Sequence, residues 1–431
     1  MNWTTIDTWI VFMGAMCAAS CAIPGTVLVL RRMSLMGDAI SHTVLPGIAV
    51  AFLITGSRDP AAMLIGAVVV GLLTAFLVQT IQSLGKVEVG ASMGIVFTVL
   101  FAFGLILMRR AVDHVDIDPD CVLYGAIELA WFDQVHIAGM GVPRGFVVNG
   151  VMLISNIGLI LVFYKEFKIT SFDPSLAKTQ GIRPSIMHYL LMTMTAVTAV
   201  AAFETVGSIL VVAMFIVPAA TAYLISDKYG VLMCLSVAIA IIAAALGHLG
   251  AITIQLWFGF SGTSTAGSMA VAAGFLFVVA WIGSPKYGLL TRAVHRIELR
   301  VRILREDVLG VLWRLEERKQ VAIQSMQLAT AIGANPLMMR FVLLRLVNQG
   351  RIAKFGKCWL LTDQGRSFAT TLVRTHRLWE VYLDKHFPQD QHQLHHSASR
   401  LEHVTTESMQ SALGDARTDP HGSIVPENED V

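Results

Sequence analysis

Two groups of residues in this 431-residue sequence have types and spacings that suit divalent metal ions. In the first group, Asp38 and His42 are four residues apart in an apolar stretch, so a helix places both side chains on one face. A carboxylate and an imidazole suit Mn²⁺, Fe²⁺ or Zn²⁺, and two ligands are too few for a tight structural site. Sparse coordination is compatible with transport, because a transported ion must be released. The spacing fits equally well a helix N-terminal aspartate that hydrogen-bonds a buried histidine.

The second group lies near the C-terminus, where residues 376–431 contain seven of the 13 histidines. Its members fall on two predicted helical faces, His376 and Glu380 on one, and His395, Ser399, Glu402 and His403 on the other. Histidine and carboxylate ligands without cysteine suit Mn²⁺ or Fe²⁺ better than a structural zinc ion. Solvent-exposed histidines without a metal are the alternative interpretation.

The elements that must position the first group are membrane spans. Residues 1–285 contain 26 of the 62 charged residues, and residues 286–431 contain 36. Because about a quarter of the residues of a soluble domain are charged, only the second part has the composition of one. A fully soluble protein, a disordered chain and a disulfide scaffold are therefore excluded. A span needs roughly 20 apolar residues, and nine are predicted, at 9–30, 34–54, 61–82, 89–108, 146–164, 186–203, 206–226, 231–257 and 266–284.

Basic residues between the predicted spans indicate the orientation of the chain. Arg31 and Arg32 follow the first span, and most of the lysines and arginines in later loops fall on the same side of the membrane. Since basic loops stay in the cytoplasm, we expect the N-terminus outside and the charge-rich C-terminal part inside. In the second span, Pro46-Gly47 predicts a break in the helix, as in the discontinuous helices of transport sites.

The loop between the fifth and sixth spans contains helix boundaries of its own. Asp173 before Pro174 marks a helix start and Gly181 a helix stop, which predicts a short helix over 173–181. Such a helix suits docking into a groove of a motor subunit, and an ordinary interfacial helix has the same pattern. No Gly-x-x-x-x-Gly-Lys-Ser/Thr motif occurs, so we expect this chain to bind no nucleotide and to be no enzyme by itself.

Four motifs, in order, resemble the permease subunit of manganese, zinc and iron uptake ABC transporters over about residues 1–290. They occupy residues 37–48, 171–182, 206–222 and 284–288. The resemblance implies a separate ABC ATPase, an extracytoplasmic metal-binding protein, a second permease (an identical or a sister subunit) and the cytoplasmic (inner) membrane of a bacterium. It assigns Asp38 and His42 to the metal path, and Asp173, Pro174, Ala177 and Gly181 to the ATPase-coupling helix, with Ser175 where an acid is common.

The charge-rich part begins with a basic linker, residues 291–305, that predicts a juxtamembrane helix resting on anionic lipid headgroups. Nucleic-acid contact is the alternative for this linker. Helical patterns at 308–317, 325–332 and 336–347, followed by a hairpin that turns at Gly356, predict a winged helix-turn-helix over 306–366. Base edges are normally read by polar side chains, whereas Leu337, Met338 and Met339 are apolar. We therefore favour protein docking or dimerisation over DNA contact, for which the candidates are Asn335, Arg340, Lys354 and Lys357.

Residues 304–426 resemble the diphtheria-toxin-repressor family of iron- and manganese-dependent regulators. The resemblance rests on the runs 361–366, 375–380, 398–403 and 419–426. It implies metal ligands at Asp307, His376, Glu380, His395, Glu402 and His403. Two positions depart from the family pattern, because Ser399 stands where a Cys or Glu ligand is expected and Gly310 where manganese-type members have an acid. An incomplete ligand set is therefore expected.

The predicted protein is mainly α-helical. It has a polytopic membrane helix bundle (1–290), the linker (291–305), a cytoplasmic winged helix (306–366) and a helical metal-binding and dimerisation region (367–431). Its expected function is alternating-access import of a divalent ion, manganese or else zinc or iron, with the C-terminal part sensing such an ion and regulating uptake. A membrane-tethered, metal-responsive transcriptional regulator and a proton-coupled secondary transporter are the alternatives.

Overall fold

The computed structural model describes residues 3–56, 60–112, 127–137, 140–258, 263–319, 323–387 and 390–427. The chain forms two compact units, Met1–Thr291 and Arg292–Val431, which are described in turn.

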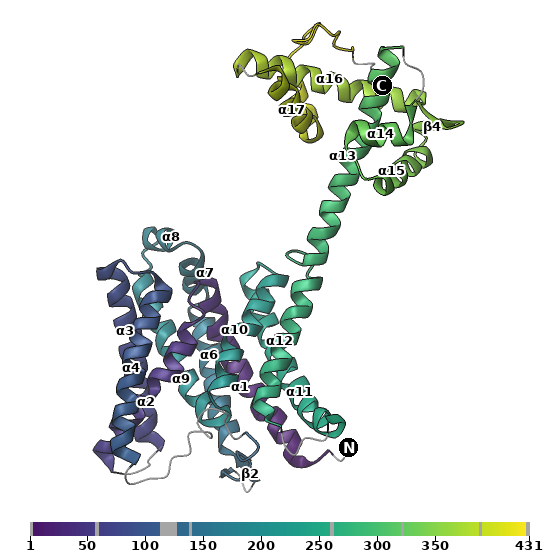
Figure 1. The fold of residues 1–431 in the computed structure, drawn as a ribbon. Helices are drawn as coiled ribbons and strands as arrows, with labels where there is room; N and C mark the ends of the chain where they lie inside the picture. Colours follow the sequence, from purple (N-terminus) through teal and green to yellow (C-terminus); the bar gives the residue numbers. More distant parts are fainter. Residues whose placement is uncertain are drawn as a thin grey trace. The chain divides into compact units, whose positions relative to one another are not determined.

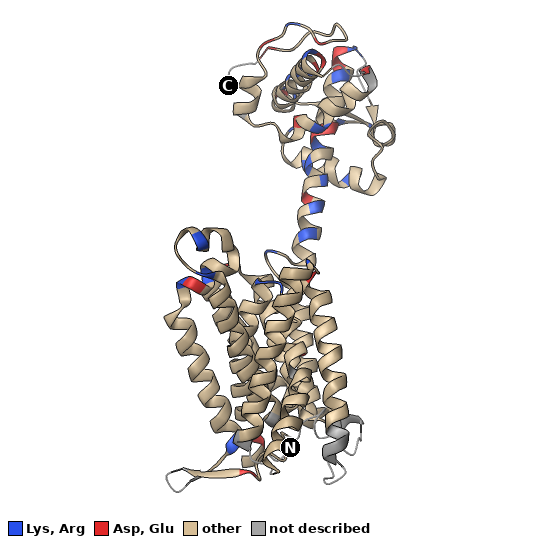
Figure 2. Ribbon diagram, turned by 90° about the vertical axis from the view of Figure 1, so that its left-hand side faces the viewer, with Lys and Arg blue, Asp and Glu red and all other residues tan. Residues whose placement is uncertain are grey.

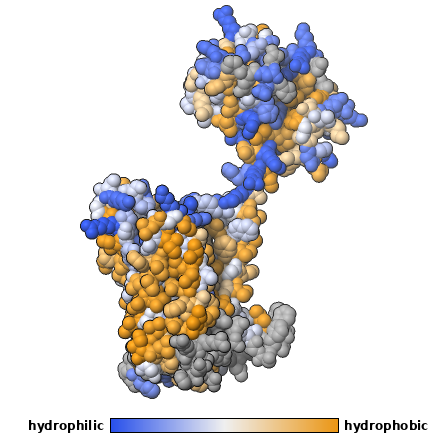
Figure 3. Space-filling model, turned by 60° about the vertical axis from the view of Figure 1, so that its left-hand side comes forward, coloured by the Kyte–Doolittle hydropathy of each residue, from blue (hydrophilic) through white to orange (hydrophobic). Residues whose placement is uncertain are grey.

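The first unit is a bundle of long helices (Figure 1). Its long helices are α1 (Thr5–Leu30), α2 (Met36–Thr55), α3 (Pro60–Gly85), α4 (Val89–Val112), α6 (Arg144–Val162), α9 (Pro184–Val206), α10 (Ser208–Ile225), α11 (Tyr229–Phe258) and α12 (Thr265–Gly283). All nine, within the described ranges, are long and apolar enough to cross a membrane, which confirms the predicted number and positions. Their outer surface is apolar (Figure 3), and charged residues gather at the two ends of the bundle (Figure 2).

Helix α1 forms the centre of this bundle. It begins with a capping box between Thr4 and Asp7, and it packs against α6, α9, α10 and α11. Small residues bring its backbone close to its neighbours, since a Cβ added to Gly25 would lie 2.1 Å from the carbonyl oxygen of Phe215 in α10. The neighbouring α2 packs mainly on α3 and α4.

The predicted break at Pro46-Gly47 is wrong, because α2 continues through both residues to Thr55. Gly47 packs directly on α3, where its added Cβ would lie 2.3 Å from the carbonyl oxygen of Gly66. Pro46 faces Gly104 of α4, where an added Cβ would lie 2.7 Å from the proline Cδ. Two glycines therefore supply the space that lets a proline remain inside an intact membrane helix.

Two elements between the long helices differ from the predicted loops. The hairpin of β1 (Gln134–Ile137) and β2 (Met140–Pro143) precedes α6, where only a loop was expected. After α6, helix α7 (Tyr164–Phe172) precedes the predicted short helix, which is α8 (Pro174–Thr179). Asp173 caps α8 as predicted, and it also ends α7, so the Asp-Pro pair separates two helices as well as starting the second.

Helix α13 (Leu289–Glu317), most of which belongs to the second unit, is a single helix that includes both the basic linker and the first predicted helix of the winged-helix region. The remaining elements are β3 (Ile323–Gln324), α14 (Ser325–Ile332), α15 (Pro336–Asn348), β4 (Ile352–Phe355), β5 (Cys358–Leu361), α16 (Asp363–His386), α17 (Gln391–Leu401), the 3₁₀ turn η1 (Glu402–Val404) and α18 (Glu407–Ala412). Strands pair in the order β3-β5-β4, and the β4–β5 hairpin turns at Gly356, whose φ is +62°. The winged-helix organisation therefore has the predicted elements with one additional short strand.

Candidate metal sites

The predicted pair in the membrane unit lies together in the first two turns of α2. Nε2 of His42 is 3.4 Å from Oδ1 of Asp38, and their side chains are 27% and 40% exposed. The imidazole also lies against two rings of α4, with centroid distances of 5.4 Å to Phe97 and 5.8 Å to Phe101. A carboxylate near a helix N-terminus and an imidazole fixed by aromatic rings form an accessible, two-ligand arrangement.

Another His–Asp pair in the same bundle has a different character. Nε2 of His248 in α11 is 3.2 Å from Oδ1 of Asp7 in α1, and the histidine is 3% exposed. Asp7 also accepts hydrogen bonds from the backbone and hydroxyl of Thr4 in the capping box. This contact joins two helices, and the burial of its histidine distinguishes it from the accessible pair on α2.

The predicted coupling residues form a short, capped helix. Oδ1 of Asp173 accepts hydrogen bonds from the backbone N–H groups of Ser175 (2.9 Å) and Leu176 (3.0 Å), and Pro174 occupies the first turn. Ala177 is fully buried, and Gly181 follows the helix with φ of +80°. The geometry agrees with the Asp-Pro start and glycine stop read from the sequence.

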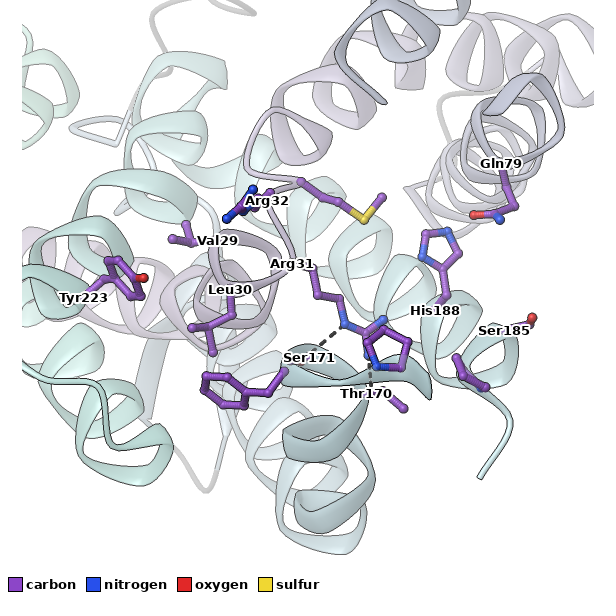
Figure 4. Close-up of a pocket in the computed structure, with 14 residues that line it drawn as sticks. Val29, Leu30, Arg31, Arg32, Gln79, Thr170, Ser171, Ser185, His188 and Tyr223 are labelled. Carbon is purple, nitrogen blue, oxygen red and sulfur yellow. Dashed lines mark hydrogen bonds between the residues drawn. The ribbon is translucent and has the colours of Figure 1, made fainter. Parts of the chain in front are cut away.

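Arg31 connects this region to the end of α1 (Figure 4). Its Nη2 donates a hydrogen bond to Oγ1 of Thr170 (2.7 Å), and its Nε donates to Oγ of Ser171 (3.4 Å), both in α7. These residues line a cavity of about 750 Å³ that also includes Arg32 and His188 and has no acid among its lining residues. A cavity lined by two guanidinium groups disfavours a divalent cation, so it is not a second metal site.

The C-terminal unit brings all six predicted ligands into two adjoining groups. The first consists of His376, Glu380 and His395, and the second of Asp307, Glu402 and His403. In the first, Oε1 of Glu380 lies 3.1 Å from Nε2 of His376 and 2.8 Å from Nδ1 of His395. These residues come from α16 and α17, which pack against each other.

Glu402 lies between the two groups. Its Oε2 is 2.6 Å from Nδ1 of His376, and its Oε1 is 3.6 Å from Nε2 of His403. His403 also lies 3.3 Å from Oδ1 of Asp307 on α13. Glu402 and His403 were expected on the same helical face as His395 and Ser399. Helix α17 instead ends at Leu401, and the turn η1 carries both residues.

The contact between His376 and Glu402 tests whether these residues fit a metal ion. Both side chains are buried, and neither Nδ1 of His376 nor Oε2 of Glu402 makes a hydrogen bond, although the two atoms are only 2.6 Å apart. Buried polar atoms normally have a hydrogen-bond partner. Two potential ligand atoms that converge without one are typical of an ion site, so the donor set fits a divalent metal.

Electrostatics in the second group favour a cation. Burial alone would lower the pKa of His403, but the carboxylates of Asp307, Glu306 and Glu402 outweigh it and raise that pKa to about 10. Burial would also raise the pKa of Glu306, yet hydrogen bonds from His403 and Arg302 lower it. In the absence of metal, a proton on His403 therefore provides the positive charge that the surrounding carboxylates require.

The first group behaves in the same way. Burial opposes ionisation of Glu380, but hydrogen bonds from His376 and His395 lower its pKa to about 2. Burial likewise disfavours protonated His376, and the nearby carboxylates of Glu380 and Glu402 nevertheless raise the pKa of this histidine. The first group thus holds the Glu380 carboxylate in the ionised form that binds metal.

Two contributors were missed in the sequence. Glu306, 7% exposed, has Oε2 2.7 Å from Nδ1 of His403 and receives a hydrogen bond from Nε of Arg302. His421 places Nε2 3.8 Å from Oε1 of Glu380. Glu306 could have been found as an acid next to a candidate ligand, and His421 lies in one of the runs that carries the family resemblance.

The departures from the family pattern lie together. Ser399 and Gly310 both line a cavity of about 200 Å³ beside Asp307 and Glu402. No larger side chain fills the space where another ligand is expected. The predicted gap in the ligand set therefore corresponds to a physical space next to the second group.

The candidate DNA-contacting residues lie on α15 and the β4–β5 hairpin. Arg340, Lys354 and Lys357 are exposed. Asn335 instead caps α15, since its Oδ1 accepts a hydrogen bond from the backbone N–H of Leu337. The structure therefore gives Asn335 a structural role in the helix start.

Comparisons with known proteins agree with this division of the chain. A model described as the ABC 3 transport family matches residues 5–284, and one described as the iron dependent repressor, metal binding and dimerisation domain, matches residues 362–427. The manganese transport system membrane protein MntD of Bacillus subtilis is 41% identical over 296 residues, which cover 68% of this chain and 98% of that protein.

Two further relatives extend the comparison. The zinc transport system membrane protein TroD of Treponema pallidum is 32% identical over 362 residues, 84% of this chain and 97% of that protein. In a solved structure of PsaBC from Streptococcus pneumoniae in complex with Fab, one chain is 31% identical with a TM-score of 0.54, covering 66% of this chain and 94% of that one. With nine apolar helices of spanning length in its described ranges, this chain is a multi-pass membrane protein. It belongs to the ABC 3 transport family.

Proposed function

We propose that this chain is the permease subunit of an ABC importer that moves a divalent transition metal ion into the cytoplasm, with manganese as the first candidate and zinc or iron as the others. The main observation behind this proposal is the Asp38/His42 pair, in which an accessible carboxylate and an accessible imidazole lie 3.4 Å apart within a membrane helix. Ionisable side chains within spans are costly and are retained where they serve a function. The manganese and zinc permeases among the relatives support the same class of cargo.

A separate ATPase supplies the energy in this proposal. The ATPase binds helix α8, and Arg31 links the region of α8 to the helix that carries the metal pair. Arg31 is held by Thr170 and Ser171, just before the Asp173 cap of α8, and it also precedes α2 in the chain. A displacement of α8 therefore reaches the helix that carries Asp38 and His42 through one guanidinium.

The remaining partners follow from the same proposal. An extracytoplasmic metal-binding protein delivers the ion, and a second permease, identical or a sister subunit, completes the pathway. The assembly resides in the cytoplasmic membrane of a bacterium, with the end of the bundle that carries α8 facing the cytoplasm. The C-terminal unit is then cytoplasmic, since α13 follows α12 at that side.

The C-terminal unit acts as a sensor of cytoplasmic metal that inhibits uptake. The buried ligand set around Glu402 supports metal binding, and the match to a repressor metal-binding domain supports a regulatory use. An ion that binds one transporter state more tightly than another shifts the equilibrium between them. Differential binding by this unit can thus decrease import when cytoplasmic metal rises.

Metal uptake by cells that co-express the ATPase and the extracytoplasmic protein tests the proposal. Asp38→Ala and His42→Ala are each expected to reduce uptake to background, with unchanged amounts of assembled permease in the membrane. The matched controls are Asp133→Ala and His136→Ala, an exposed acid and histidine outside the spans, which should transport normally. Undiminished uptake in the α2 variants contradicts the proposed metal path, and uptake without the ATPase favours a proton-coupled transporter.

A further inference from the structure

The wing segment, defined here as residues 323–361, has an unusual charge balance. From Arg318 to Thr362 the sequence contains seven lysines and arginines and no aspartate or glutamate. Five of these cations lie in the wing segment, at Arg340, Arg345, Arg351, Lys354 and Lys357. The carboxylates of the C-terminal unit lie in α13, α16 and the segments that follow, so the wing segment itself contributes only positive charges.

The same segment exposes large apolar side chains. On α15, Leu337, Phe341 and Leu344 follow the spacing of one helical face, with exposed fractions of 76%, 53% and 62%. At the hairpin end of β4, Phe355 is 77% exposed, and at the start of α14, Met326 is 68% exposed. Helix α15 contacts both α14 and β4, and the three elements lie close together in Figure 1. The apolar side chains therefore belong to one region and are not scattered singly.

Positive charge interleaved with exposed aliphatic and aromatic groups does not fit DNA readout. Base edges are read by hydrogen-bonding side chains, and here Leu337 and Phe341 occupy exposed positions in the first turns of α15. The mixture does fit a bilayer surface, where apolar groups enter the acyl boundary and Lys and Arg attract anionic headgroups. The same chain also crosses the bilayer, and this covalent attachment gives the wing segment a high effective concentration at the membrane surface.

We propose that the wing segment docks on an anionic phospholipid surface, with Leu337, Phe341 and Phe355 entering the interface and the surrounding lysines and arginines contacting the headgroups. A winged-helix face of this kind serves as a peripheral membrane anchor and not as a reader of sequence. This inference does not depend on the identity of the transported metal or on metal binding by the C-terminal unit.

Hydrogen exchange of the full-length protein in lipid nanodiscs tests the docking. Discs of phosphatidylcholine alone are compared with discs that also contain phosphatidylglycerol. Exchange over residues 336–358 should be slower in the anionic discs, and the difference should diminish as salt is added. Each cation at an anionic surface raises the docked population roughly fivefold, so the double variant Lys354→Glu, Lys357→Glu should lose the protection.

The apolar contribution is tested with Leu337→Glu and Phe355→Glu, which change exposed side chains and are expected to fold normally. The matched controls are Phe387→Glu and Ile424→Glu, which are also exposed, at 56% and 72%, but lie outside the wing segment. Only the wing variants should lose lipid-dependent protection. Equal exchange in both lipids overturns the proposal. Protection of the same residues by duplex DNA in neutral discs overturns it in favour of nucleic acid, and protection that requires two copies per disc overturns it in favour of self-association.

Discussion

The membrane pair and the C-terminal cluster use the same side-chain types in different surroundings. Asp38 and His42 offer one carboxylate and one imidazole, with side chains 40% and 27% exposed. In the cluster, the side chains of His376, Glu380 and Glu402 are between 2% and 6% exposed, and further carboxylates and imidazoles surround them. The first arrangement can exchange an ion quickly, whereas the second can hold one.

The two roles in the proposed function place different requirements on metal binding. A transport site must bind loosely enough to release its ion on each cycle. A sensor must instead remain occupied above a set concentration, which requires several converging ligands whose protons the metal can replace. In the proposed function, burial and ligand number, more than residue type, therefore distinguish the transport site from the regulatory site.

The largest effect is expected when one ligand is removed from either the cluster or the membrane pair and both metal affinity and uptake are measured. Glu402→Gln removes the carboxylate shared by both groups of the cluster, and Mn²⁺ affinity of the purified full-length protein should fall by more than about 100-fold, beyond the usual cost of losing an outer-shell partner. Uptake at low external metal should persist, but its decrease at high cytoplasmic metal should disappear. Calorimetric titration and cellular uptake measure the two effects.

Asp38→Asn should give the opposite result, with uptake lost and the affinity of the cluster unchanged. Glu316→Gln is the matched control for the cluster, since Glu316 is a partly exposed carboxylate paired with Arg366 away from the ligands. If Glu402→Gln and Asp38→Asn impair the same measurement, the two sites are not functionally separate.

The membrane unit could be predicted from the sequence to a large extent because its signals are local. Nine apolar stretches of spanning length, and a pair of ligands four residues apart, can be read within single helices. The intact α2 could not, because its continuity at Pro46 depends on Gly104 of another helix. The helix α7 was missed since its residues 164–172 mix charged and apolar types without a cap to mark the start.

The cluster was predictable in its members and not in its arrangement. The i, i+4 spacing of His376 and Glu380 is local, but the contact between His403 and Glu306 joins residues 97 apart in the chain. Such convergence arises from the packing of α13, α16 and α17, and no periodic pattern encodes it. The family resemblance supplied Asp307 as a ligand, whereas the neighbouring Glu306 required the structure.

The metal affinity of the cluster should depend on pH, with an effect of intermediate size. The pKa of His403 is about 10 in the metal-free protein, so this imidazole is protonated throughout the range from about pH 6 to about pH 8. Metal must displace that proton, and Mn²⁺ affinity of the cluster should therefore rise about tenfold per pH unit for each proton released. Titrations in buffers of different ionisation enthalpy count the protons. His403→Gln should lower the slope by one proton, and an affinity independent of pH contradicts the protonated state.

Refilling the gap in the cluster gives the smallest expected effect. Ser399 and Gly310 line the cavity beside Asp307 and Glu402, and a Cβ added at Gly310 makes only an ordinary contact, 3.6 Å from Leu372. Ser399→Glu and Gly310→Glu should therefore fold and add a ligand, raising Mn²⁺ affinity by less than about tenfold, because the new carboxylate loses rotamer freedom and hydration.

Ser399→Gln is the matched control, which fills the same space with a neutral side chain. A gain with glutamate and not with glutamine indicates that the cluster is limited by ligand number, whereas an equal gain from both indicates better packing of the cavity. Since added charge there should delay metal release, Ser399→Glu should also make inhibition of uptake persist longer after cytoplasmic metal falls, while transport through Asp38 and His42 stays unchanged.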